Sequence, residues 1–267
     1  MKHHGFGPVL AIANQKGGVG KTTTSINLAA SLAALDKRVL LIDLDPQGNS
    51  TSGLGVDKHS VERGTYDILM QESLLCDAVM KTPYNCLSLL PASMDLAGAE
   101  VELVNEDARE QRLQAAFSGY KGEPFDYVII DCPPALNLLT VNALTATDQV
   151  MITLQTEFYA MEGLSQLMDT IRRVRQSLNP ALNMDGILLT MVDRRNNLAV
   201  QVEQDVREYF GSQVYANIIP RNVRLSEAPS FGLPAMYHDV QSKGAQAYLA
   251  VAQEMISRNG GARNDED

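Results

Sequence analysis

The sequence predicts an α/β fold, a doubly wound and mostly parallel sheet flanked by helices. Short aliphatic runs alternate with stretches of helical spacing along the chain, and the runs carry no interior charge, as expected of strands buried on both faces. We find neither an internal repeat nor a long linker, so the 267 residues fit one large domain. We expect that domain to cover 9–258, between a flexible segment 1–8 and a disordered acidic tail 259–267.

The first strand is predicted at 9–13, and a loop rich in glycine follows it and ends in Lys21, Thr22 and Thr23. A helix with a wide apolar side is predicted at 22–35. Between a strand and a helix, glycines let successive backbone N–H groups face one anionic group at the helix N-terminus. Lys21 would add a positive charge there, and Thr22 would present a hydroxyl to a magnesium ion. This stretch therefore predicts a phosphate-binding loop.

The loop departs from the common pattern G-x-x-x-x-G-K-[ST], because Gln15 stands where that pattern has its first glycine. Lys16 instead precedes Gly17 and gives K-G-G-x-G-K-T, with a second lysine. Residues 14–23 thus resemble the deviant Walker A type of P-loop NTPase, and within it the ParA/Soj family of chromosome- and plasmid-partitioning ATPases. The resemblance implies that one run of loop residues binds ATP: Lys16, Gly17, Gly18, Val19, Gly20, Lys21, Thr22 and Thr23.

The second strand, predicted at 38–43, is followed closely by a second aspartate, so that Asp43 and Asp45 stand together. Open α/β sheets bind ligands at the carboxyl ends of their strands, so both should lie beside the phosphate loop. The resemblance makes this segment a switch region and assigns Asp45 to the attacking water. We place Asp43 nearer the magnesium shell or the loop. Either aspartate could instead only end the strand and cap the turn that follows.

The middle of the chain has weaker patterns. Glycines interrupt residues 50–72, so we expect a loop there with one short helix at 66–70. A strand is predicted at 87–91. Residues 97–117 have helical spacing, and the glutamates early in this helix fit a solvated face better than a site: Glu100, Glu102 and Glu106.

Residues 127–131 form the next predicted strand, which ends in Asp131 and is followed by Cys132 and two prolines. This resembles a Walker B strand, which implies that Asp131 holds magnesium through water and that the prolines stiffen a turn sensing the γ-phosphate. We expect Cys132 to be a small core residue, although related iron-sulfur ATPases carry cluster cysteines. With Cys76 and Cys86 it makes an odd count without a C-x-x-C pair, so we expect reduced thiols and no structural metal.

The last third of the chain completes the alternation. Strands are predicted at 149–154, 186–192 and 214–219, and helices at 161–178, 199–210 and 242–258. The last two strands should end on the nucleotide side of the sheet. There the resemblance places the adenine among three residues: Met191, Pro220 and Asn222.

The formal net charge of −10 argues against a uniformly basic surface for nucleic acid, but the charge is uneven. Residues 172–224 carry eight basic side chains, all of them arginine, and five acidic ones. The resemblance suggests that Arg195 and Arg224 contact DNA, since the arginine fork pairs with phosphate whatever the base sequence. Both could also be ordinary solvated charges.

The resemblance implies an ATP- and Mg²⁺-dependent partitioning cycle. ATP would favour a homodimer in which Lys16 reaches the partner's phosphates, as part of catalysis, and Gly17 leaves room for it. The dimer would bind double-stranded DNA without sequence preference. A ParB-type centromere-binding protein would stimulate the weak intrinsic hydrolysis and release the dimer from DNA.

We expect a cytoplasmic, nucleoid-associated protein with no membrane partner. No charged-then-apolar leader precedes the first strand, and anionic lipid would repel the acidic C-terminus. The alternative is a membrane-cycling positioning ATPase of the MinD type, which would need a basic amphipathic C-terminal helix. A second alternative is an electron-transfer or metal-handling ATPase.

Overall fold

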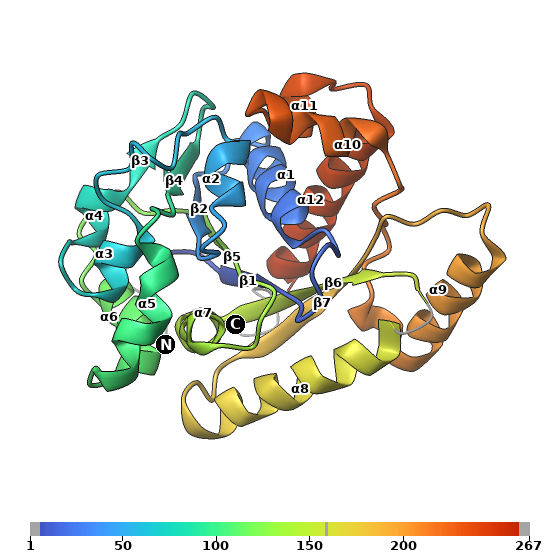
Figure 1. Ribbon diagram of the computed structural model, residues 1–267. Helices are drawn as coiled ribbons and strands as arrows, with labels where there is room; N and C mark the ends of the chain where they lie inside the picture. Colours follow the sequence, from blue (N-terminus) through green and yellow to red (C-terminus); the bar gives the residue numbers. More distant parts are fainter. Residues whose placement is uncertain (1–5, 158–159, 262–267) are drawn as a thin grey trace.

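The computed structural model describes residues 6–157 and 160–261, and within them seven strands form one sheet in the order β3-β4-β2-β5-β1-β6-β7 (Figure 1). Neighbouring strands run parallel except at one edge, where β3 is antiparallel to β4. The predicted doubly wound, mostly parallel sheet is confirmed. The strands are β1 Val9–Ala13, β2 Val39–Asp43, β3 Met80–Lys81, β4 Leu87–Leu90, β5 Tyr127–Asp131, β6 Gln149–Gln155 and β7 Asn183–Thr190.

Helices cover both faces of the sheet, and each face has its own apolar cluster. One face is covered by α1 Lys21–Ala34, α10 Val223–Glu227, α11 Ala235–His238 and α12 Lys243–Gly261. The other face is covered by α3 Thr65–Leu69, α4 Leu75–Ala78, α5 Leu96–Glu102, α6 Arg112–Ser118, α7 Leu138–Ala146, α8 Ala160–Ser177 and α9 Asn197–Phe210. The short α2, Asn49–Gly53, follows β2. Because both faces are covered, every residue of β1, β2 and β5 is buried.

The strand order brings the motifs of the sequence together. β5 lies between β2 and β1, so Asp43 at the end of β2 is in register with Asp131 at the end of β5. Asp131 is also in register with Ile12, just before the phosphate loop. The loop and both aspartates therefore share the carboxyl edge of the sheet.

The prediction of a single helix at 97–117 is wrong. The chain forms α5, then two 3₁₀ turns, Leu103–Asn105 and Arg109–Gln111, and then α6. Between the two turns, Ala108 has a left-handed φ of 49°. Arg112 holds this break, because its guanidinium donates to the carboxylate of Glu106 at 2.9 Å and to the carbonyl of Asp107 at 2.8 Å.

The prediction of a strand at 214–219 is also wrong, since within this segment Val214 alone forms a bridge, an isolated one with Ile187 of β7. The backbone N–H groups of Ala216 and Asn217 donate to the carboxylate of Glu254, on α12, at 2.8 and 2.9 Å. A helix side chain thus takes the N–H groups that a strand would need for its ladder.

Smaller differences lie near the switch region and the chain ends. The loop expected at 50–72 begins with α2, whereas the short helix expected there is present as α3. Phe6, from the segment expected to be flexible, packs its ring on Phe117 and Tyr120, and α12 extends to Gly261, into the expected tail. The rest of those two segments lies outside the described residues. In the described parts of the chain, no helix has both the length and the apolar character needed to cross a bilayer.

Candidate nucleotide site

The phosphate loop leaves β1 and enters α1 through two left-handed glycines. Gly18 and Gly20 have φ values of 74° and 84°, which side chains disfavour, and Gly20 is the N-cap of α1. At the end of β7, Thr190 donates its hydroxyl to the carbonyl of Val19 at 2.8 Å and ties the loop to another strand. Within the described residues no side chain caps α1, so its first N–H groups can serve an anion.

Lys21 points back into the loop that precedes it. Its residue is 6% exposed, and Nζ donates to the carbonyl of Lys16 at 3.0 Å. Burial lowers the pKa of this amine, and the nearby Asp131 opposes that shift. The ammonium is thus partly desolvated within the loop that is predicted to bind phosphate.

Asp131 accepts hydrogen bonds from three hydroxyl groups. Ser25 lies at 3.0 Å from Oδ1, Ser50 lies at 2.8 Å from Oδ2, and the Thr22 side chain bonds to it as well. Burial raises the pKa of Asp131 to about 6, and these hydroxyls oppose the shift. Hydroxyl and carboxylate oxygens suit Mg²⁺, so Thr22 with Asp131 behind it fits a magnesium site.

Asp43 lies beside Asp131 but bonds to the switch region. Its Oδ2 accepts both the backbone N–H and the hydroxyl of Thr51, each at 2.7 Å. Burial, followed by repulsion from Asp131, raises the pKa of Asp43 to about 7. The structure thus places Asp43 next to the proposed magnesium site, while its direct contacts hold the start of α2.

Asp45 lies at the start of the switch turn. Only 6% of the residue is exposed, and Oδ1 accepts the backbone N–H of Gln47 at 2.9 Å. Asp45 also contributes to the electrostatics of Lys21 and Asp131. Asp45 therefore lies near Lys21 and Asp131, at the edge of the sheet where the phosphate loop begins.

Lys16 differs from Lys21 in its exposure, its partner and the direction of its side chain. Its side chain is 55% exposed, and Nζ pairs with Glu157, just after β6, at 2.5 Å. The amide nitrogen of Lys16 donates to the Asn14 side chain at 3.0 Å, and Asn14 in turn donates to the carbonyl of Thr153 at 2.6 Å. One lysine therefore points into its own loop and the other points outward.

The residues predicted to surround the adenine lie just after β7 and just before α10. Pro220 and Asn222 line an open groove of about 1050 Å³, whose other lining residues include Arg195, Arg221 and Lys243. Met191 does not line this groove; it directly follows Thr190, the residue bonded to the phosphate loop, and has a left-handed φ of 51°. Val192, the residue after Met191, lines the groove and forms an isolated bridge with Pro220, so Met191 directly precedes the residue that pairs with Pro220. The predicted DNA contact Arg195 lines the same groove.

The two arginines predicted to contact DNA are exposed but paired with acids. The Arg195 side chain is 88% exposed and forms a two-pronged pair with Asp193, at 2.8 and 2.7 Å, which lowers the pKa of Asp193 to about 2. Arg224 pairs with Glu227 at 2.9 Å and with Asp239 at 3.3 Å. DNA phosphates would have to compete with these carboxylates.

Several residues of the site were missed by sequence reasoning. Ser25 could have been found, because it lies one helical turn after Lys21 on α1. Ser50 and Glu157 have no such local signal, since the order of the strands brings them to Asp131 and Lys16. Thr51 bonds to Asp43 within the same segment, eight positions away. Cys132 is buried in the core, as expected, and burial raises the pKa of its thiol.

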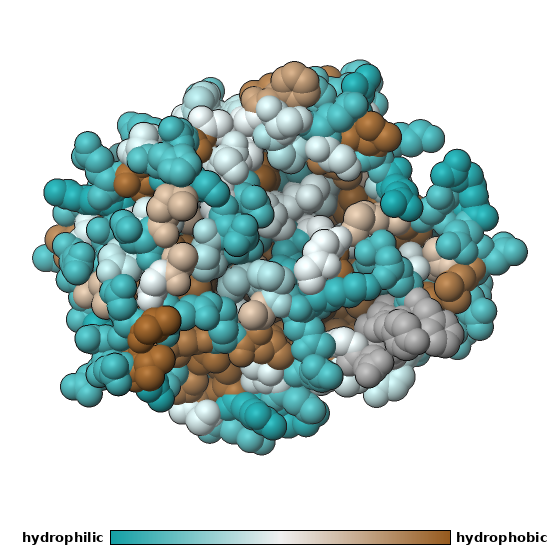
Figure 2. Space-filling view, viewed as in Figure 1, coloured by the Kyte–Doolittle hydropathy of each residue, from teal (hydrophilic) through white to brown (hydrophobic). Residues whose placement is uncertain are grey.

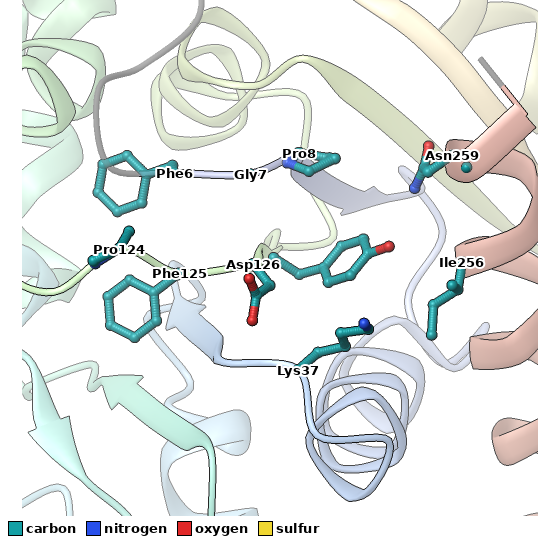
Figure 3. Close-up of a pocket in the computed structure, with 11 residues that line it drawn as sticks. Phe6, Gly7, Pro8, Lys37, Pro124, Phe125, Asp126, Ile256 and Asn259 are labelled. Atoms are coloured by element: carbon teal, nitrogen blue, oxygen red, sulfur yellow. The ribbon is translucent and has the colours of Figure 1, made fainter. Parts of the chain in front are cut away.

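A separate cavity of about 470 Å³ lies at the opposite end of the strands (Figure 3). Phe6 and Pro8 before β1, Lys37 before β2 and Asp126 before β5 line it, together with Asn259 near the end of α12. None of the predicted site residues is among its lining residues. The residues predicted to bind nucleotide therefore lie away from this cavity.

Comparisons with known proteins find relatives that match along most of the chain. A family model described as "AAA domain" matches residues 7–184. The sporulation initiation inhibitor protein Soj of Bacillus subtilis is 54% identical over 96% of this chain and 100% of its own length. The chromosome partitioning protein ParA of Caulobacter vibrioides is 56% identical, over 94% of each chain.

Solved structures with the same fold include nucleotide complexes. Cobyrinic acid a,c-diamide synthase from Mycobacterium smegmatis, with a bound ATP analogue and magnesium, is 40% identical and has a TM-score of 0.81, over 92% of this chain and 93% of that one. MinD from Pyrococcus horikoshii, complexed with Mg-ADP, is 24% identical with a TM-score of 0.77, over 92% and 95%, and so shares the fold.

Proposed function

This chain belongs to the ParA/Soj family of chromosome-partitioning ATPases, and from that premise we propose that it is an ATP-driven DNA-partitioning protein. ATP and Mg²⁺ are its cofactors, and ATP joins two copies into a dimer. The dimer binds double-stranded DNA without sequence preference. A ParB-type partner stimulates the weak hydrolysis and so releases the dimer.

The observation that carries this proposal is the contrast between the two lysines. Lys21 is buried in its own loop, whereas the Lys16 side chain is half-exposed and, among the residues that the structure describes, its ammonium pairs with Glu157 alone. An exposed ion pair of this kind contributes at most about 1 kcal/mol, so Lys16 can leave it for a triphosphate on a second subunit. One lysine would serve its own nucleotide and the other the partner's.

Gly17 supports the same arrangement. In the described part of the chain, a Cβ added at Gly17 would meet no atom within 4 Å, and Gly17 is not among the glycines with positive φ. Neither steric fit nor backbone conformation within one subunit therefore requires glycine here. The close approach of a second subunit provides a reason.

The roles proposed for the other residues follow from their positions at the carboxyl edge of the sheet. Thr22 and Asp131 would hold magnesium, with Asp43 beside them, and the bound ion would neutralise charge on the phosphate oxygens. Asp45 orients the attacking water. On the adenine side we assign Met191, Pro220 and Asn222.

Lys16→Ala is expected to leave ATP binding within about threefold of the wild type and to prevent the ATP dimer, because the outward lysine contributes to the partner's site and not to its own. Equilibrium binding of a fluorescent ATP analogue, with light scattering after gel filtration, measures both quantities. Glu157→Gln is the matched variant; since it removes only an exposed pair, it should change dimer formation by no more than about fivefold. A Lys16→Ala protein that dimerises normally contradicts the assignment.

Arg195→Glu and Arg224→Glu are each expected to lose DNA retention while ATP binding and dimerisation persist. Each change removes one phosphate contact per subunit, so the slope of log affinity against log salt should fall by about two per dimer. Gel retardation with ATP, ADP and no nucleotide, over a salt series, gives the slope. Arg172→Glu on α8 is the control, because Arg172 is also exposed and paired with an acid three residues away. Equal retention by all three proteins removes the DNA assignment.

We assign the protein to the cytoplasm and the nucleoid on the same family grounds. A membrane-cycling role of the MinD type remains the rival, and sedimentation with anionic liposomes and ATP tests it. Binding to liposomes in preference to DNA would overturn the partitioning role.

A further inference from the structure

One wall of the groove that Pro220 and Asn222 line is a segment of irregular backbone held against α12. Figure 1 places the groove between α12 and the chain that follows β7, and in Figure 2 the surface is hollowed on that side, between α10 and α9. The irregular segment and α12 contribute six of the lining residues: Ala216, Asn217, Ile218, Lys243, Gln246 and Ala247. The shape of the groove therefore depends on how this segment is held.

Side chains of α12 hold the segment where a strand would have a hydrogen-bond ladder. The Glu254 carboxylate accepts the backbone N–H groups of Ala216 and Asn217 at 2.8 and 2.9 Å, and also the side-chain amide of Asn217 at 2.8 Å. Arg258, one turn further along α12, donates to the same carboxylate at 2.8 Å and to the carbonyl of Val214 at 3.0 Å. One glutamate–arginine pair thus bonds to three residues of the segment.

The Glu254 carboxylate is nearly enclosed, and its charge is stabilised there. Its side chain is 14% exposed. Burial acts to raise the pKa of Glu254, but the hydrogen bonds from Asn217, Ala216 and Arg258 outweigh burial and lower the pKa. A glutamine could not make the same bonds, because one end of its amide is itself a donor and would face an N–H group. Two acceptor oxygens are therefore needed at this position.

The bonds to Glu254 lie three positions before Pro220, and the chain between them has little freedom. The backbone N–H of Ile219 donates to the carbonyl of Leu189, on β7, at 2.9 Å. Pro220 then forms its isolated bridge with Val192. Glu254 thus fixes one end of a short span and β7 fixes the other, so a shift at residues 216–217 would change the wall that Pro220 continues.

We propose that Glu254 is a positioning residue for adenine, which holds residues 216–217 so that Pro220 and Asn222 can contact the base. This inference rests on the proposed function, since that function assigns Pro220 and Asn222 to adenine. The phosphate groups depend on a different part of the chain, residues 16–23, none of which lines this groove. The adenine and phosphate contributions to nucleotide affinity can therefore be changed separately.

Isothermal titration of the full-length protein with ADP and with pyrophosphate, each with Mg²⁺, separates the two contributions. Neither ligand has a γ-phosphate, so hydrolysis and the ATP dimer do not enter, and the ratio of the two affinities measures what adenosine adds. Glu254→Gln should weaken ADP binding about tenfold and change pyrophosphate binding by less than about twofold. Asn217→Ala removes one donor to the same carboxylate and should lower the ratio about threefold.

Glu106→Gln is the matched control. Glu106 also accepts a hydrogen bond from an arginine, Arg112, at 2.9 Å, but it does not line the groove. Its ratio of ADP to pyrophosphate affinity should equal that of the wild type. Retained pyrophosphate binding in Glu254→Gln shows that this variant is folded, and Asn217→Ala, which removes no charge, decides the test if it is not.

Two results overturn the inference, and they differ in what else they contradict. If the ratio is unchanged in the Glu254 and Asn217 variants, even where both affinities fall together, Glu254 has a purely structural role and the proposed function stands. If the wild type itself binds pyrophosphate as tightly as ADP, the groove does not bind adenine, and the adenine assignment in the proposed function fails as well.

Discussion

Lys21→Ala is expected to weaken ATP binding by at least about 100-fold. The Lys21 ammonium is already buried in the loop, where it donates to the carbonyl of Lys16, and each charge-assisted hydrogen bond that it makes to a phosphate is worth about 1.5–3 kcal/mol. Two such bonds give about 3–6 kcal/mol, or a factor of at least about 100. Isothermal titration with ATP and Mg²⁺ measures the loss directly.

The melting temperature of the Lys21→Ala protein without nucleotide is the control for folding. Because burial lowers the pKa of Lys21, its ammonium is disfavoured in the empty loop, and removing it should not lower the melting temperature without nucleotide. Lys21→Met keeps the aliphatic chain and should behave like Lys21→Ala. Near-normal ATP affinity in both variants would show that this loop does not bind the triphosphate.

Asp45→Ala is expected to trap an ATP-bound dimer on DNA, with hydrolysis reduced at least about 100-fold. A group that positions or deprotonates an attacking water typically contributes 10²–10⁴ in rate, whereas ATP affinity rests on the phosphate loop and should stay within about threefold. Single-turnover hydrolysis, together with light scattering in ATP, measures both effects. A monomeric Asp45→Ala protein, or one that turns over normally, would contradict the role.

Asp45→Asn separates chemistry from folding. The asparagine oxygen can still accept the Gln47 N–H, so the turn should form while the carboxylate is lost. We expect hydrolysis as low as in Asp45→Ala. Asp57→Asn is the matched control outside the site, since Asp57 accepts the N–H of His59 two residues on, at 3.0 Å, in the same local geometry. Its hydrolysis should be unchanged.

The parts of the fold that the sequence predicted well are those with strong local patterns. β1 and β5 have the predicted bounds, because uninterrupted aliphatic runs have few alternatives in a sheet covered on both faces. The errors at 97–117 and 214–219 have a common cause. In both places a side chain from further along, Arg112 or Glu254, bonds to backbone groups that the predicted element needed.

In the candidate site, too, local patterns were predicted and long-range contacts were not. Lys16, Lys21 and Thr22 could be identified because glycine spacing and lysine position are local properties of the chain. The groove near Pro220 was not predicted, since it forms between segments that are far apart in sequence and includes Lys243, whose position in the chain gave no signal. Arg195 and Asp193 are close in sequence, but their pairing depends on the direction of the two side chains, which the sequence does not give.

By itself the sequence determined the class of sheet, the phosphate loop between its first strand and helix, and the aspartates that end two later strands. It could do so because each of these features depends on residues within a few positions of one another. The tertiary structure alone decided what surrounds them: Asp131 meets Ser25 and Ser50 across 106 and 81 positions, and Lys16 meets Glu157 across 141. Such contacts depend on strand order, which places distant strand ends at one edge and which no local pattern records.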